Sequence, residues 1–259
     1  MPKFAANLTM LFTEFEFVDR FEAAAQAGFG AVECHFPYRY PKEQLAERLG
    51  RLGLQLVLYN LPAGDWDAGE RGIAALPDRV GEFQDGVGQA IDYARALGCK
   101  QLNCLAGVPP GGMPAEKIRE TLIANLRFAA GKLKTAGIRL LVEAINTREV
   151  PGFYLCRTQQ TLDLIDATGS DNVFLQYDIY HMQRMEGDLA LTMQRHLARI
   201  AHVQVADNPG RNEPGTGEIN FPFLFALLDR IGYQGWIGCE YKPRTTTAAG
   251  LGWYTPWRR

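Results

Sequence analysis

The chain has 259 residues, of which 47% are hydrophobic and 22% charged, and its formal net charge is −2. This composition is typical of a folded globular protein. It lacks the positive excess of nucleic-acid-binding proteins and an apolar run of about 20 residues that could span a bilayer. We therefore expect no nucleic-acid partner and no membrane association. The five cysteines lack CxxC spacing and the N-terminus lacks a secretory signal, which predicts buried thiols in a cytoplasmic protein.

Eight short apolar segments predict β-strands. Most are too uniformly hydrophobic for strands with one face in water, so they favour parallel strands covered on both faces. In chain order they are FAANLTM (4–10), GAVECHF (30–36), LQLVLYN (54–60), KQLNCLAG (100–107), IRLLVEAI (138–145), VFLQYD (173–178), AHVQVAD (201–207) and GWIGCEY (235–241).

Helical patterns lie between these strands. Apolar residues recur on one helical face around 45–52, 83–94, 122–133 and 224–231, and several of the predicted helices end at a glycine. This alternation predicts an α/β protein folded as a single (β/α)8 TIM barrel over residues 1–259. A doubly wound open sheet is the alternative, but NLTMLF after the first strand lacks the glycine-rich phosphate turn of that fold.

The longest connection covers residues 60–82, NLPAGDWDAGERGIAALPDRVGE. A connection of this length in a compact domain is either functional or disordered. Because Trp66, Ile73 and Leu76 can pack against the domain, we expect an ordered active-site loop.

Oxygen-bearing side chains stand at the ends of the last four predicted strands. In a TIM barrel these ends meet at the catalytic face, so the four side chains are expected to surround one point. Three carboxylates this close repel one another unless a cation lies between them, and oxygen ligands suit Mg²⁺ or Mn²⁺. Each acid taken alone could equally cap a helix. The predicted set is Glu143, Asp178, Gln204 and Glu240.

Other polar residues fall near the same face. His181 follows the acid of the sixth strand by three residues, and we expect it to contact a hydroxyl or enolate oxygen of a substrate. Asn7 and Asn60, at the ends of the first and third strands, are expected to add neutral hydrogen bonds. His35 is expected on the site wall, and His202 in the core.

These residues together resemble the hydroxypyruvate isomerases, within the xylose-isomerase-like barrel superfamily that also contains sugar epimerases and endonuclease IV. The resemblance extends over nearly the whole chain. It is carried by FAANLTMLF, LPAGDWDAGERGIAALP, LQYDIYHMQRMEGD, EPGTGEIN and GCEYKPRTTTAAGLGW.

The resemblance implies a reversible interconversion of hydroxypyruvate and tartronate semialdehyde. It implies acid/base roles for Glu143 and Glu240, and metal-site positions at Glu143, Asp178, Gln204 and Glu240. The wider superfamily often has histidine where Gln204 stands. Glutamine at this position disfavours zinc and leaves metal dependence itself open.

The implied reaction moves a proton between adjacent carbons through a cis-enediolate. It needs a base, an acid and positive charge beside the substrate oxygens, which a divalent cation would supply. The substrate also carries a carboxylate, for which Arg71, Arg211 and Lys242 are the candidate partners. Each of these cations could equally be a solvated surface residue.

Several alternatives remain open from the sequence. A 2-oxo-tetronate isomerase or a sugar 3-epimerase would use the same two-glutamate chemistry. A phosphodiesterase acting on damaged DNA would need a histidine-rich multi-zinc site, which four histidines and a net charge of −2 disfavour. A catalytically silent sugar-acid-binding barrel is disfavoured by the glutamate pair. The expected partner is a small 2-oxo or 3-hydroxy acid, and the sequence is compatible with a homo-oligomer.

Overall fold

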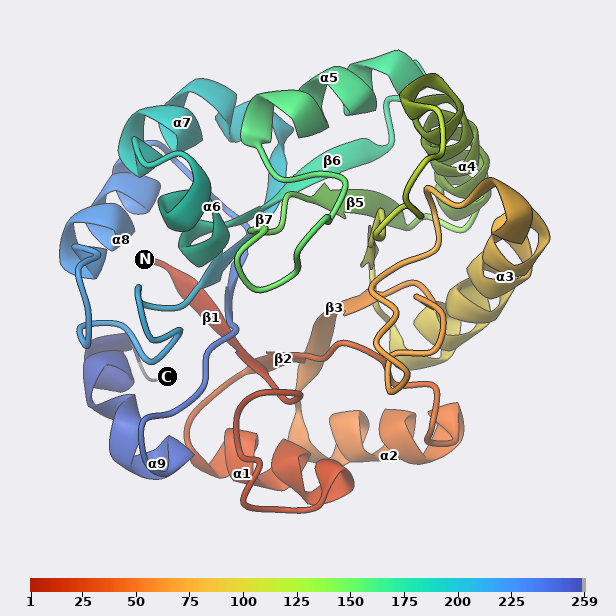
Figure 1. Ribbon diagram of the computed structural model, residues 1–259. Coiled ribbons are helices and arrows are strands. Elements are labelled where there is room, and N and C mark those ends of the chain that lie inside the picture. The colour runs from red at the N-terminus through yellow and green to blue at the C-terminus, as the bar shows by residue number, and fades with distance from the viewer. Residues whose placement is uncertain (258–259) are drawn as a thin grey trace.

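Eight parallel strands form a closed barrel in the computed structural model, which describes residues 1–257 (Figure 1). The strands follow one another around the barrel in sequence order, and the last pairs with the first. This confirms the predicted (β/α)8 barrel. The strands are β1 (Lys3–Asn7), β2 (Ala31–Glu33), β3 (Gln55–Asn60), β4 (Gln101–Cys104), β5 (Arg139–Glu143), β6 (Val173–Asp178), β7 (Ile200–Val205) and β8 (Trp236–Cys239).

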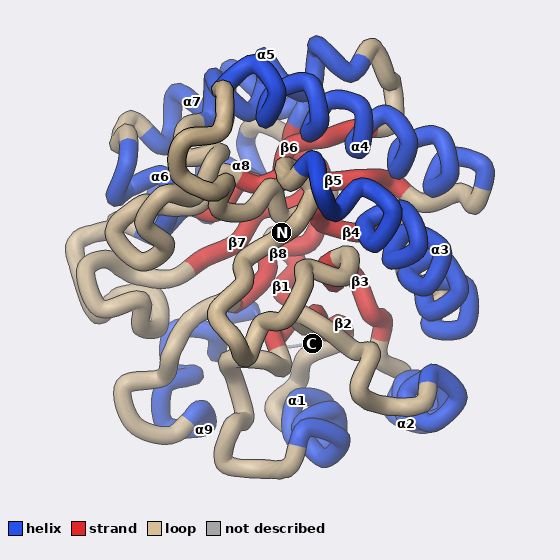
Figure 2. Tube along the Cα trace, turned by 45° about the vertical axis from the view of Figure 1, so that its right-hand side comes forward, coloured by secondary structure: helices blue, strands red, loops and turns tan. Residues whose placement is uncertain are grey.

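The helices form a ring outside the strands (Figure 2). No helix in the described part of the chain has the length and apolar character needed to cross a membrane. The helices are α1 (Arg20–Gln26), α2 (Lys42–Leu52), α3 (Val80–Leu97), α4 (Ala115–Thr135), α5 (Thr158–Thr168), α6 (Ile179–Met185), α7 (Leu189–His196), α8 (Phe221–Arg230) and α9 (Thr247–Gly250).

The apolar stripes predicted from the sequence face the barrel. In α4, Leu122, Leu126 and Leu133 are fully buried, because a 3.6-residue period places them on one face of the helix. The α2 helix ends at Gly53, whose positive φ of 64° is a left-handed conformation that glycine adopts without strain. Sharp helix ends of this kind return the chain to the barrel for the next strand.

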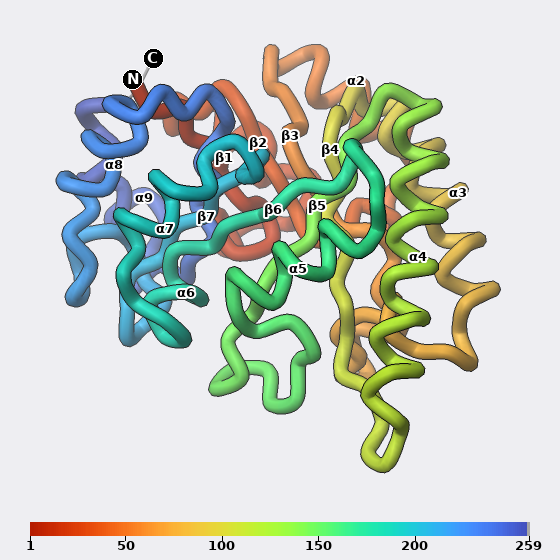
Figure 3. Tube along the Cα trace, turned by 90° about the horizontal axis from the view of Figure 1, so that it is seen from above, coloured from red at the N-terminus to blue at the C-terminus, as the bar shows by residue number. Residues whose placement is uncertain are grey.

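The βα connections gather at the carboxyl ends of the strands. Figure 3 shows those after β4 and β5 projecting on the side opposite the N-terminus. The connection after β3 runs through residues 61–76 before the short helical turn Pro77–Arg79 and α3. Its Ile73 is buried, and Trp66 and Leu76 pack against the main core. The carboxyl ends of the strands are therefore surrounded by ordered loops.

Candidate active site

A cavity of about 540 Å³ opens at the carboxyl ends of the strands. Strand and loop residues from all around the barrel line it, including Trp66 of the 60–82 loop. Eight residues selected from the sequence are among them: His35, Asn60, Arg71, Glu143, His181, Arg211, Glu240 and Lys242. The other three, Asn7, Asp178 and Gln204, are almost completely buried and contact the lining residues from within the barrel.

Glu143 ends β5, and its carboxylate has one bound and one free oxygen. Oε2 accepts a hydrogen bond of 3.1 Å from the Asn103 side chain, and Oε1 lies 3.9 Å from Nε2 of His181. Burial raises the pKa of Glu143 well above the usual range for a glutamate, and the charges of Glu240 and Asp178 raise it further. Its surroundings therefore favour the protonated form of Glu143.

Glu240, directly after β8, has both oxygens engaged. Oε1 accepts from the Arg211 guanidinium at 2.6 Å and lies 3.4 Å from Nε2 of His35. Oε2 accepts from the side-chain amides of Gln204 at 2.5 Å and Asn7 at 3.2 Å. Burial alone would raise the pKa of Glu240, but His35 and Arg211 lower it to about 2. The pKa values of the two pocket glutamates are thus shifted in opposite directions, which is how a site assigns an acid and a base.

Asp178 ends β6 and begins α6, where its Oδ1 accepts the backbone N–H of His181 at 3.0 Å. Its Oδ2 is buried and has no hydrogen-bond partner. Burial raises the pKa of Asp178 to about 7, although Arg211 acts in the opposite direction. A buried carboxylate oxygen without a donor is costly, so this atom is suited to a cation or a proton.

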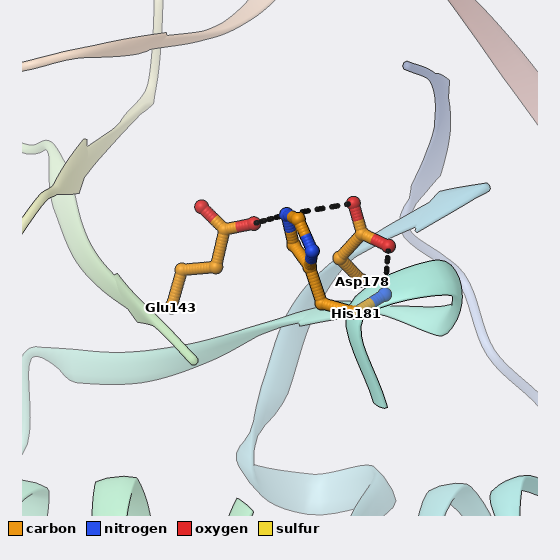
Figure 4. Close-up of side chains that lie close together, drawn as sticks. All are labelled: Glu143, Asp178 and His181. Carbon is orange, nitrogen blue, oxygen red and sulfur yellow. Dashed lines mark hydrogen bonds and ion pairs between the residues drawn. The ribbon is translucent and has the colours of Figure 1, made fainter. Parts of the chain in front are cut away.

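Glu143, Asp178 and His181 form a buried group whose candidate ligand atoms all lie within 4.8 Å of one another. Figure 4 shows the carboxyl groups of Glu143 and Asp178 on either side of the imidazole of His181. The free oxygens Oε1 of Glu143 and Oδ2 of Asp178 are each 3.9 Å from Nε2 of His181. The donor set therefore fits a divalent cation held by carboxylate oxygens.

The hydrogen bonds of His181 indicate which of its nitrogens carries a proton. Oδ1 of Asn146 accepts the backbone N–H groups of Arg148 and Glu149, so the Asn146 amide nitrogen faces Nδ1 of His181 at 2.7 Å. Nδ1 is then the acceptor, and Nε2 carries the hydrogen. Burial lowers the pKa of His181 well below its usual value, with Arg211 adding to the effect, so the ring is neutral. His181 therefore presents an N–H donor to the pocket, and the carboxylates of Glu143 and Asp178 are the groups that can bind a cation.

Gln204 was expected as a ligand, and the structure places it beside Glu240. Its carbonyl oxygen accepts a 2.6 Å hydrogen bond from Gln176, and its amide nitrogen lies 2.8 Å from Glu33 and 2.5 Å from Glu240. Turning the amide over would place its oxygen against both carboxylates. In this arrangement Gln204 is a donor to carboxylates, and it would present oxygen to a cation only after that rearrangement.

The three candidate cations have different surroundings. Arg211 bridges Glu149, at 2.8 Å, and Glu240, at 2.6 Å. Its backbone is left-handed (φ 55°) and belongs to a loop that Asp207 holds in place. The Asp207 carboxylate accepts the backbone N–H groups of residues 215, 217 and 219.

Arg71 and Lys242 lie at the side and rim of the cavity. Arg71 donates to the carbonyls of Trp66 and Glu70, and its guanidinium lies 4.3 Å from the centre of the Trp66 ring. Lys242 is exposed at the rim.

The two asparagines also differ in position. Asn60 lines the cavity and accepts a 3.1 Å hydrogen bond from Asn103, which also donates to Glu143. Asn7 lies beneath the cavity and donates to Glu33 at 2.9 Å as well as to Glu240.

Four residues that hold the site were not selected from the sequence. Asn103, Asn146 and Glu149 contact Glu143, His181 and Arg211, respectively, and Glu33 contacts Gln204 and Asn7. Glu33 carries a signal that could have been used, because GAVECHF also delivers a carboxylate near a strand end. Asn103 lies in KQLNCLAG at the position equivalent to Asn60 in its own strand. Asn146 and Glu149 lie in the irregular loop after β5, where no periodicity in the sequence indicates which way a side chain points.

The chain belongs to the xylose isomerase-like TIM barrel family, whose model matches residues 21–257. A hydroxypyruvate isomerase of Escherichia coli strain K12 is 56% identical over 258 residues, which cover 100% of both chains. A 2-oxo-tetronate isomerase of Cupriavidus necator is 46% identical, and 99% of each chain is covered.

A crystal structure described as an AP endonuclease, family 2, from Brucella melitensis superimposes with a TM-score of 0.98. It is 45% identical in sequence, and both chains are covered completely. The resemblance inferred from the sequence motifs is confirmed by these comparisons, as is the expectation of an isomerase on this fold.

Proposed function

We propose that the protein reversibly isomerises hydroxypyruvate to tartronate semialdehyde by proton transfer between Glu143 and Glu240. The observation that carries this proposal is that two glutamates line one cavity in different surroundings, Glu143 beside the neutral Asn103 amide and Glu240 beside the Arg211 guanidinium. The 56% identity to the hydroxypyruvate isomerase of Escherichia coli supports the choice of substrate.

The forward reaction begins with the ionised Glu240, which removes a proton from C3 of hydroxypyruvate. The electron pair forms the C2–C3 double bond of a cis-enediolate, and the protonated Glu143 returns a proton to C2. The hydroxyl proton moves from the C3 oxygen to the C2 oxygen, which balances the exchange of carbonyl and alcohol. Each positioned acid or base contributes about 10²–10⁴-fold. The reverse reaction uses the same groups with their roles exchanged.

Neutral His181 directs its Nε2–H into the cavity between Glu143 and Asp178. We assign it the substrate oxygen on which charge develops, since a neutral donor in a buried site can stabilise an enediolate oxygen without protonating it fully. Lys242 and Arg71 are assigned to the substrate carboxylate. Arg211 is already bound to Glu240 and Glu149, so its role is to keep Glu240 ionised.

A divalent ion, Mg²⁺ or Mn²⁺, would be held by Glu143 and Asp178, which offer free oxygens to the cavity. When bound, it would supply positive charge to the substrate oxygens, worth several kcal/mol in reactions of this class. The orphaned Oδ2 of Asp178 supports this assignment. Because a cation displaces the proton of Asp178, its binding is expected to release a proton, whereas Glu143 keeps the proton that it transfers to C2 and would contribute only its unprotonated oxygen.

A four-carbon substrate, 2-oxo-tetronate, is the second candidate. A cavity of about 540 Å³ has room for a further carbon, and the Cupriavidus necator relative supports this substrate. A DNA endonuclease is disfavoured, because the metal-binding group found within residues 1–257 contains one histidine and the net charge is −2. We further propose a cytoplasmic location, in keeping with four buried free thiols.

Proton NMR in D₂O tests the proposal with hydroxypyruvate, 2-oxo-tetronate and a free ketose in parallel. We expect hydroxypyruvate to incorporate solvent deuterium and to have the highest kcat/KM, and chelation to lower the rate. Absence of deuterium exchange with all three substrates would contradict an isomerase. A higher kcat/KM for 2-oxo-tetronate would change the assigned substrate and leave the proposed reaction as it is.

We also propose that the 60–82 loop closes over the substrate and excludes water from the enediolate. Trp66 and Arg71 of this loop already line the cavity. Bound substrate should protect the loop from proteolysis, and equal cleavage with and without substrate would contradict closure.

A further inference from the structure

We propose that Glu33, buried inside the barrel beneath the cavity, is a positioning residue for Glu240. This inference rests on the base role proposed for Glu240. Glu33 has no exposed surface and does not line the cavity, so it cannot touch a substrate held there. Its effect on the reaction would be exerted through two side-chain amides, those of Asn7 and Gln204.

Both amides join the two carboxylates. The Asn7 nitrogen lies 2.9 Å from Oε1 of Glu33 and 3.2 Å from Oε2 of Glu240. The Gln204 nitrogen lies 2.8 Å and 2.5 Å from the same two atoms. A primary amide has two N–H groups, so each amide can give one hydrogen to each carboxylate. Glu33 thus holds both nitrogens in place beside Glu240, while the backbone N–H of Thr9 and the Gln176 amide donate to the oxygens of the same two amides.

The remaining partner of Glu33 is also oriented by a chain of donors. Arg139 donates to Oε1 of Gln101 at 2.9 Å, which leaves the Gln101 nitrogen facing Nδ1 of His202 at 3.2 Å. Nδ1 of His202 is then the acceptor, and Nε2–H donates to Oε2 of Glu33 at 2.7 Å. Asn7, Gln204 and His202 therefore all donate to Glu33. An amide of Asn7 or Gln204 that turned over would place its oxygen against the Glu33 carboxylate.

Strand β8, separated from β2 only by β1, leaves space for this carboxylate. A Cβ atom on Gly238 of β8 would lie 2.3–2.5 Å from the carboxyl atoms of Glu33. Any side chain at position 238 would displace the Glu33 carboxylate from the two amides. Glu33 and Gly238 form a matched pair that packs a charge where a TIM barrel ordinarily packs apolar side chains.

The shared donors distinguish this arrangement from a merely structural one. A carboxylate retained only for folding could accept all its hydrogen bonds from donors that contact no catalytic residue, as His202 does. Instead, two of its three donors continue to Glu240. Replacing the charge at position 33 weakens the acceptor shared by the two amides, so that the hydrogen bonds that position the Glu240 carboxylate are loosened.

The test is Glu33→Gln, assayed with hydroxypyruvate beside wild type, Glu240→Gln and the double variant. We expect E33Q to lower kcat about 10–100-fold with KM within about threefold, because the loss falls on the reacting group. In the E240Q background E33Q should cause no further loss, since residues that act as a unit are not additive. Glu213→Gln is the matched control. Glu213 is a buried glutamate that accepts a backbone N–H from Arg244, and E213Q should retain wild-type kcat.

Gly238→Ala is the second variant, because it moves the Glu33 carboxylate without burying a new amide and should reproduce the loss of kcat. Wild-type kcat in soluble E33Q or G238A would overturn the inference, as would a full additional loss in the double variant. If wild type does not turn over hydroxypyruvate, or if E240Q remains active, the proposed function fails instead. The two failures are therefore distinguishable.

Discussion

The two halves of the barrel bring different chemistry to the same cavity. Strands β5 to β8 and the residue directly after β8 form the charged half, which contains the acids Glu143, Asp178 and Glu240 and the amide Gln204. Strands β1 to β4 carry mainly amides, Asn7, Asn60 and Asn103, together with Glu33 inside the barrel. The acids of the first group are candidates for the reaction, and the amides of the second group are their hydrogen-bond donors.

Each reacting glutamate is held by an asparagine from the opposite half. Asn103 donates to Glu143 at 3.1 Å, and Asn7 donates to Glu240 at 3.2 Å. Neutral donors can hold a carboxylate without cancelling its charge, whereas His35 and Arg211 lower the pKa of Glu240. The comparison indicates that one half of the barrel performs the chemistry and the other half keeps the acids in place.

The largest effect is expected from the charged half, with Glu143→Gln and Glu240→Gln. The amide retains the shape of the side chain but cannot relay a proton, so kcat should fall about 10³-fold or more while the fold is retained. Steady-state kinetics and circular dichroism measure the two properties. Wild-type turnover in either variant would remove that residue from the mechanism.

A second effect concerns stability and pH in the chelated protein. The pKa of Asp178 is raised from 3.8 to about 7, so its contribution to stability is present below pH 4 and is lost as pH rises through 7. The interval between these values corresponds to roughly 4 kcal/mol in the free energy of unfolding. Glu143, also raised, acts in the same direction, and Glu240, lowered to about 2, acts only below pH 4.5.

Urea unfolding between pH 4 and 8, with chelator and then with Mn²⁺, measures this dependence. The decline should be smaller in Asp178→Asn, and Mn²⁺ should offset it in wild type because the cation replaces the protons. Stability that is constant or rises over this range in the chelated protein would contradict the assignment of Asp178.

The amide half should give a smaller effect. Asn103→Leu removes the donor to Oε2 of Glu143 while retaining the approximate volume of the side chain. We expect kcat to fall by up to about tenfold with little change in KM, since one hydrogen bond between neutral groups contributes about 0.5–1.5 kcal/mol. A raised KM with unchanged kcat would mean that Asn103 binds substrate and does not position the glutamate.

The smallest effect is expected at Arg139, at the start of β5 and thus at the end of the barrel opposite the cavity. Arg139→Gln shortens the donor to Gln101, which relaxes the orientation of His202 and Glu33. A lost hydrogen bond of about 1 kcal/mol predicts a decrease in kcat of about fivefold or less. Arg139→Lys, which retains a cationic donor, is the control. Equal rates in all three proteins would show that the chain of donors ends before Glu240.

Most of the fold could be predicted from the sequence, because its elements are local. VFLQYD coincides with β6, and the stripe of Leu122, Leu126 and Leu133 forms the buried face of α4. The selected acids could be found for the same reason, since Glu143 and Asp178 each end an apolar strand. Asn146 and Glu149 could not be found in this way, because a loop has no period from which the direction of a side chain follows.

The sequence by itself determined the barrel and the residues at its mouth, because burial and side-chain alternation are read from neighbouring positions. Only the tertiary structure decided what those residues do to one another. Burial raises the pKa of Glu143, and Arg211 and His35 lower that of Glu240, although both are glutamates at strand ends. Proton affinity depends on distances between strands far apart in the chain, and these distances exist only in the closed barrel.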